Sequence, residues 1–132
     1  DTIQAIQNRR AIKHYDPNHR MRPEEIEQLL SLAILAPTAF NFKTGLLVED
    51  PEIRKEIRAV AWDQAQVTDA SLLIVLCADL RAWDRDPARY WCNAPKEVRE
   101  LMVPAIRQYY ENREDVQRDE AMRSSGIVAQ TI

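Results

Sequence analysis

The sequence has very little glycine, cysteine and histidine, and each scarcity excludes a class of site. Only two glycines occur among 132 residues, so neither a GxGxxG motif nor a Walker-type phosphate loop can be written. The two histidines and two cysteines show neither CxxC spacing nor a zinc-ligand pattern. A bound phosphate would therefore have to be held by side chains, and we expect no metal site.

The sequence also lacks long apolar runs and any large excess of charge. No apolar run approaches transmembrane length and no signal peptide is visible, so we expect no membrane partner. The net charge of −3 argues against broad nucleic-acid binding. Cys77 lies in an apolar run and is predicted to be a buried free thiol, which favours a reducing, cytoplasmic location. The length and the 45% hydrophobic content predict one globular domain over residues 1–132.

Helical periodicity is the main pattern that the sequence does contain. The clearest example is a predicted helix over 23–36, where Pro23 occupies the first turn and Pro37 ends the helix. Shorter helices are predicted over 2–8, after the start signal Asp50-Pro51-Glu52, and from Pro95, with a kink or break at Pro104. The expected strands are 46–48 and the apolar run 70–78. Two strands make a marginal sheet, so we predict an α+β fold with helices packed on a small, incomplete β-sheet.

Two segments carry the chemistry that these patterns leave open. The segment Arg9–Tyr15 follows the first helix and contains three fixed positive charges, those of Arg9, Arg10 and Lys13. Arginine presents a planar fork of donors that matches phosphate oxygens. The second segment, Ala36–Asn41, closes the 23–36 helix with small and polar residues. A solvated basic patch remains the alternative interpretation of the first segment.

Several segments together resemble one family of flavoproteins. Arg9-Arg10-Ala11-Ile12-Lys13-His14-Tyr15 resembles the RRSxRxF signature of the nitroreductase family, and Ala36–Asn41 is similar to its APSxxN loop. Asp63-Gln64-x-Gln66 resembles its third segment, and Glu120-Ala121-x-x-Ser124-x-Gly126 its late helix. Because the order and spacing agree, the chain is identified as a member, with a nitroreductase-like fold and a long helix in a dimer interface.

The resemblance implies an FMN-dependent oxidoreductase that takes hydride from NAD(P)H and reduces nitroaromatics, quinones or similar acceptors by a ping-pong mechanism. It implies a homodimer and no catalytic residue, because the flavin carries the chemistry. The implied cofactor-binding residues fall into four groups. They are Arg9, Arg10 and Ala11 at the FMN phosphate; Lys13 at the pyrimidine edge; Pro37, Thr38, Ala39 and Asn41 against the ring from the other subunit; and Asp63 and Gln66 at the polar ring edge.

The sequence departs from the family pattern in three places. Ala11 replaces the usual serine, and Phe42-Lys43-Thr44-Gly45-Leu46 stands where xQPWxF is usual. The chain also stops at Ile132, within the expected dimer helix, so we expect a domain truncated at its C-terminus. Two alternatives stay open: a non-catalytic helical dimerisation module that uses residues 119–132, and a binder of another anion or nucleotide that uses the basic segment.

Overall fold

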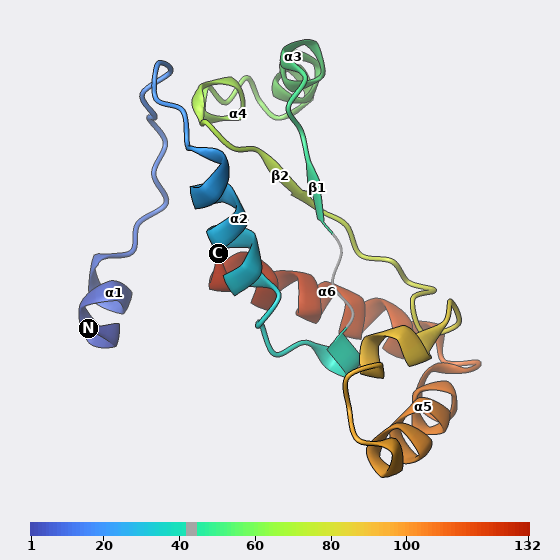
Figure 1. Cartoon of the computed structure of the whole chain (residues 1–132). Coiled ribbons are helices and arrows are strands. Elements are labelled where there is room, and N and C mark those ends of the chain that lie inside the picture. The colour runs from blue at the N-terminus through green and yellow to red at the C-terminus, as the bar shows by residue number, and fades with distance from the viewer. Residues whose placement is uncertain (42–44) are drawn as a thin grey trace. The chain divides into compact units, whose positions relative to one another are not determined.

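The computed structural model describes residues 1–41 and 45–132, and their helices dominate the fold (Figure 1). Two short strands pair antiparallel, and Val48 N–H continues the pairing by donating to the carbonyl of Leu73 at 3.0 Å. In chain order the elements are α1 (Thr2–Asn8), α2 (Pro23–Ala33), η1 (Ala39–Asn41), β1 (Gly45–Leu47), α3 (Pro51–Val60), α4 (Gln66–Asp69), β2 (Ile74–Leu76), η2 (Pro87–Trp91), α5 (Lys96–Tyr110) and α6 (Glu114–Thr131), where η marks a 3₁₀ helix.

The chain divides into two compact units. Unit 1 comprises 1–22 and 47–74, and unit 2 comprises 23–46 and 75–132. In unit 1, the predicted start of α3 is confirmed: the Asp50 side chain accepts hydrogen bonds from the N–H groups of Glu52 and Ile53. Arg54 on α3 donates to three backbone carbonyls, those of Val48 (2.7 Å), Ala70 (2.6 Å) and Ser71 (3.4 Å). One half-buried arginine thus ties the helix to the segments before and after it.

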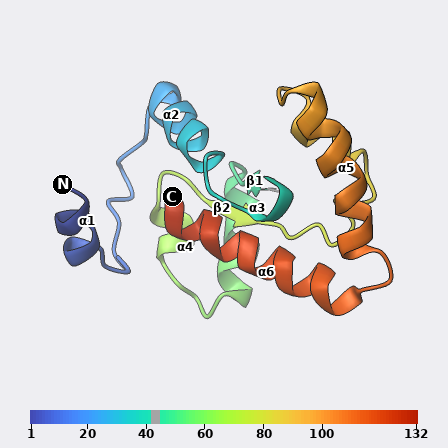
Figure 2. The ribbon, with the colours of Figure 1, turned by 90° about the horizontal axis from the view of Figure 1, so that it is seen from below.

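Unit 2 is built around α6, the longest helix of the described chain. Figures 1 and 2 show α5 beside the first turns of α6 and α2 beside its last turns, while η1 also contacts α6. The most deeply buried residues lie on or next to these elements: Ile106 on α5 is fully buried, and Tyr110 on α5 and Ala36 in the turn after α2 are nearly so. Packing of three segments on one helix therefore supplies the core of this unit.

Several boundaries differ from those predicted. Helix α2 ends at Ala33, three residues early, because Leu35 and Ala36 make tighter bonds to Leu32 and Ala33 before Pro37. Only Ile74–Leu76 of the apolar run is strand, and β1 begins at Gly45.

Two further predictions from the sequence need correction. Of the kink or break predicted at Pro104, the break is wrong: α5 continues through Pro104, because the amide that proline lacks removes a single hydrogen bond from the helix. Cys77 is half-buried rather than buried. Among the described residues, no helix combines the length and the apolar character needed to cross a bilayer.

Candidate functional site

The basic segment, Arg9–Tyr15, is an exposed extended stretch after α1. Arg9 ends the helix by donating its N–H to the carbonyl of Ala5 at 3.0 Å, and its backbone is then extended. The Arg10 guanidinium folds back onto the carbonyls of Gln7 and Arg9, each at 2.8 Å. Within the described residues, no carboxylate forms an ion pair with Arg9, Arg10 or Lys13. Their charges are therefore available to an anion, while Ala11 contributes only backbone.

Asp63 lies between α3 and α4, and Gln66 is the first residue of α4; this part of unit 1, residues 61–66, is called the α3–α4 turn below. Trp62 and Asp63 both have left-handed backbone, with φ values of 54° and 52°, a conformation that asparagine and aspartate tolerate better than tryptophan does. The Asp63 carboxylate accepts from Arg58 Nε at 2.7 Å, although 82% of its side chain is exposed. The Gln66 amide donates to the Gln64 side chain. Both predicted polar groups thus have a local partner and an exposed or half-exposed side.

The anchored loop, Pro37–Asn41, belongs to unit 2 and is held at several points. Thr38 N–H donates to the carbonyl of Ala36 at 2.9 Å, and Ala39 N–H donates to Ser124 Oγ on α6 at 3.3 Å. Phe40 has left-handed backbone with a φ of 48°. The side chain of Asn41 and the departure at Phe42-Lys43-Thr44 lie outside the part of the chain described.

An aromatic cluster on the end of α5 holds Phe40. The Phe40 ring lies 5.7 Å from the ring of Tyr109 and 5.6 Å from that of Tyr110, in tilted and edge-on arrangements. The Tyr110 ring also stacks on Trp83 at 6.4 Å. Such pairs add about 0.5–1.5 kcal/mol beyond burial. The two contacts of Phe40 join residues that are about 70 positions apart in the sequence, so periodicity could not have indicated them.

A small cavity of about 30 Å³ lies beside this loop, within unit 2. It is bordered by Ala39, by the segment Leu76–Trp83, by Tyr110 and by one face of α6. Its volume is about that of one water molecule. Trp83 Nε1, on a residue that lines the cavity, and Thr38 Oγ1 are buried without a hydrogen-bond partner. The cavity is too small for a cofactor.

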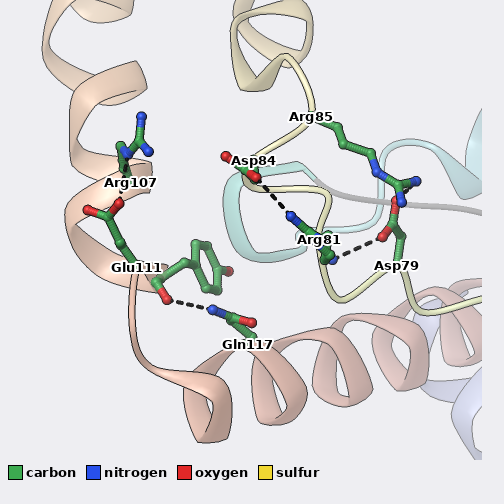
Figure 3. Close-up of polar contacts among 8 residues, drawn as sticks. Asp79, Arg81, Asp84, Arg85, Arg107, Glu111 and Gln117 are labelled. Atoms are coloured by element: carbon green, nitrogen blue, oxygen red, sulfur yellow. Dashed lines mark hydrogen bonds and ion pairs between the residues drawn. The ribbon is translucent and has the colours of Figure 1, made fainter.

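The polar contacts around the aromatic cluster fix the turn from α5 to α6 (Figure 3). The Gln117 side chain on α6 donates to the Tyr110 carbonyl at 2.8 Å, and Arg107 pairs with Glu111 at 3.1 Å. Burial raises the pKa of Tyr110 to about 12, and the charges of Glu120 and Tyr109 act in the same direction. The Tyr110 hydroxyl therefore stays protonated at neutral pH.

A second group in Figure 3 comprises four charged residues between β2 and η2. Asp79 accepts from the backbone N–H of Arg81 at 2.9 Å and pairs with Arg85 at 3.3 Å, and Arg81 pairs with Asp84 at 3.3 Å. Every carboxylate here already has a basic partner. No group of three metal-ligating side chains occurs in residues 1–41 and 45–132.

The sequence-predicted site residues thus fall into three groups. Two of these groups lie in unit 1 and the third lies in unit 2. The groups are the basic segment, with Arg9, Arg10, Ala11 and Lys13; the α3–α4 turn, with Asp63 and Gln66; and the anchored loop, with Pro37, Thr38, Ala39 and Asn41. Sequence reasoning did not assign Ser124, Tyr109 and Tyr110, which hold the loop. Ser124 does occur in one of the resembling motifs, but a serine inside a helix gives no sign of a partner 85 residues away.

Comparison with known proteins agrees with the motif pattern. The model of the nitroreductase family matches residues 6–132. Protein DrgA of Synechocystis is 50% identical over 134 residues, which cover all of this chain and 64% of DrgA. YodC of Bacillus subtilis, proposed to be an NAD(P)H nitroreductase, is 26% identical over 98% of this chain and 67% of its own length.

Solved structures give the same result for the fold. A protein from Exiguobacterium sibiricum, proposed to be a nitroreductase and crystallised in complex with FMN, superposes with a TM-score of 0.86. It is 30% identical, and the match covers 99% of this chain and 67% of that protein. The present chain therefore spans about two thirds of the length of these relatives, and slightly less than that of DrgA.

Proposed function

This chain belongs to the nitroreductase family, and we propose that it is part of an FMN-dependent oxidoreductase that transfers electrons from NAD(P)H to a small-molecule acceptor. The family assignment covers most of the chain, and a solved relative holds FMN. Bound FMN supplies the redox chemistry, accepting a hydride and passing electrons on. The residues of this chain then have to bind, orient and polarise that cofactor.

The basic segment fits the phosphate of FMN. Its three cations have no carboxylate partner among the described residues, whereas most other arginines, Lys55 and Lys96 are paired or hydrogen-bonded. Arg9 and Arg10 offer bidentate donors to phosphate oxygens. Ala11 provides only its backbone where the family pattern has a hydroxyl. This observation carries the proposal: the segment that matches the family's motif holds three unneutralised cations, of which Arg9 and Arg10 are proposed to meet the phosphate.

Lys13 and the α3–α4 turn have complementary roles in the proposal. Lys13 places a positive charge where the pyrimidine edge of the ring is expected, and a cation there stabilises negative charge on the reduced ring. Gln66 and Asp63 offer an amide and a carboxylate to the polar edge. Because Asp63 is already paired with Arg58, its negative charge is largely compensated, and it opposes Lys13 only weakly.

The anchored loop would supply the surface on which the ring lies. Pro37, Thr38 and Ala39 are small, so a planar ring can approach their backbone closely. In the proposed homodimer this loop serves the site of the other subunit, and α6 contributes to the interface. Exposed apolar residues on unit 2, among them Leu35, Leu101 and Met122, are consistent with a covering partner.

The ping-pong order, the reduction of nitroaromatics or quinones, and the cytoplasmic location belong to the same proposal. So does the arrangement of 1–132 as a single nitroreductase-like domain with further residues beyond it. The free thiols of Cys77 and Cys92 support a reducing location.

FMN binding provides the direct test. We expect the purified protein to quench FMN fluorescence on titration, and NADH or NADPH to bleach the bound flavin under anaerobic conditions. Absence of FMN uptake would reject the proposal. In that case the dimerisation-module alternative predicts a stable dimer without flavin, which light scattering distinguishes from a monomer.

A further inference from the structure

The hydroxyl of Ser124 has a different partner from the other hydroxyls of its helix. Ser125 donates to the carbonyl of Ala121 at 3.0 Å and Thr131 to that of Ile127 at 2.8 Å, the usual bond to the preceding turn. Ser124 instead accepts the backbone N–H of Ala39, 85 residues away, at 3.3 Å. Ser124 is also 95% buried, so water cannot replace this acceptor easily.

The Ala39 amide needs that acceptor because of the shape of the loop. Thr38 uses its own N–H on Ala36, and Phe40 adopts left-handed backbone with a φ of 48°. A bulky residue in this conformation is strained. It persists only when its surroundings hold it, and here the rings of Tyr109 and Tyr110 pack on the Phe40 ring within 5.7 Å.

We propose that Ser124 and the Phe40–Tyr109–Tyr110 cluster are positioning groups for the cofactor, which fix the anchored loop in the shape that receives the flavin ring. This inference rests on the proposed function, since it assigns the loop a flavin contact. Ser124 sets the position of the Ala39 backbone, and the aromatic cluster keeps the peptide planes on either side of Phe40 turned. In this proposal both groups act through the backbone of the loop.

The test compares Ser124→Ala with the matched control Ser125→Ala. Both variants remove one hydroxyl from neighbouring positions of α6, but only the first removes the Ala39 acceptor. In FMN-free protein, Ser124→Ala should accelerate amide hydrogen exchange at Ala39, whereas Ser125→Ala should not. With FMN, Ser124→Ala should raise the dissociation constant about 2- to 10-fold, the equivalent of one hydrogen bond, and should change the visible circular dichroism of the bound flavin.

A second pair of variants tests the aromatic cluster. Phe40→Leu keeps the backbone strain but loses the ring contacts, so it should increase Ala39 exchange and weaken FMN binding. Phe40→Tyr keeps the ring and should retain the slow exchange of the native protein. If the aromatic cluster only stabilises the fold, Phe40→Leu should lower the free energy of unfolding and leave the spectrum of bound flavin unchanged.

The outcomes separate this inference from the proposed function. If the native protein binds FMN and Ser124→Ala changes neither Ala39 exchange nor FMN affinity, the positioning role is wrong. If Ala39 exchange rises while FMN affinity and spectrum stay native, the bond holds the loop but does not position it for flavin, and the inference fails. If the native protein takes up no FMN, the proposed function fails first, and the positioning role fails with it.

Discussion

The anchored loop and the basic segment are both short connections after a helix, yet the rest of the protein holds the first and leaves the second exposed. The loop is held by a hydroxyl of α6 and by two rings of α5. The basic segment is exposed throughout, and its described hydrogen bonds stay within a few residues. A loop that must present a surface needs a fixed shape, whereas cations that must meet a phosphate need charges that nothing else has neutralised.

Arginines within unit 1 repeat this contrast. The Arg54 guanidinium donates hydrogen bonds to three backbone carbonyls, and the Arg58 guanidinium donates to the side chains of Asp63 and Thr68. Both are half-buried and structural. Arg9, at the start of the basic segment, is exposed, so its side chain can serve a ligand without loss to the fold. The comparison predicts that stability and cofactor affinity respond to different residues.

The largest effect should come from removing a ring that anchors the loop. Tyr110→Ala deletes a side chain that is 97% buried and touches three other rings, so we expect a loss of about 3–5 kcal/mol in the free energy of unfolding. The matched control is Tyr15→Ala in the basic segment, whose side chain is half-exposed. It should change stability by less than about 0.5 kcal/mol. Urea denaturation measures both, and equal losses would remove the contrast.

The next largest effect concerns the cofactor. Arg9→Ala should weaken FMN binding about 10- to 100-fold, because a charge-assisted hydrogen bond is worth about 1.5–3 kcal/mol, while the unfolding free energy stays native. Arg20→Ala is the control: Arg20 bonds the carbonyls of Pro17 and His19 much as Arg10 bonds its neighbours. Fluorescence titration gives both affinities. A similar weakening in the two variants would mean that FMN responds only to overall charge.

The sequence predicted the features that depend on local chemistry. The Asp50-Pro51 start of α3 and the early helix 2–8 depend on residues within one turn, and the structure confirms them. The end of α2 was predicted less well, because the helix stops at Ala33 and not at the residue before Pro37. The order of the motifs was enough to predict the family. The contribution of each residue to a flavin site stays a prediction, because the cofactor contacts depend on chain placement that local patterns do not encode.

The features that the sequence missed depend on distant partners. Ser124, Tyr109 and Tyr110 had no local signal for a role at the loop, since a buried face of a helix looks the same whatever packs on it. The apolar run 70–78 gave only three strand residues, because pairing requires a neighbouring strand and β1 is equally short. A kink or a break was expected at Pro104, and the break is absent because one missing hydrogen bond does not end a helix that packing also stabilises.

A smaller effect should separate the two tyrosines of the aromatic cluster. Because the folded pKa of Tyr110 is about 12 against an ordinary value of 10.0, the unfolded chain loses its proton first as pH rises. The contribution of the protonated Tyr110 hydroxyl to the free energy of unfolding is therefore fully present below about pH 10 and is lost as the pH rises toward about 12. In Tyr110→Phe, the loss of unfolding free energy between these pH values should be smaller than in the native protein by on the order of 1 kcal/mol. Tyr109→Phe, at a more exposed ring, is the control, and identical alkaline profiles for the two variants would refute the assignment.

The smallest effect should be at Asp63, which combines features of both regions. Its side chain is exposed, as in the basic segment, but it has a fixed partner within the protein, as the anchored loop has. Asp63→Asn keeps a residue that accepts left-handed backbone and removes the charge that faces Arg58 at 2.7 Å. Because the carboxylate is 82% exposed, we expect a loss below about 1 kcal/mol that shrinks as salt is added. If Asp63 also meets the flavin edge, the same variant changes FMN affinity at salt concentrations where its effect on stability has vanished. If the effects of the variant on FMN affinity and on the free energy of unfolding disappear at the same salt concentration, Asp63 serves only as the partner of Arg58.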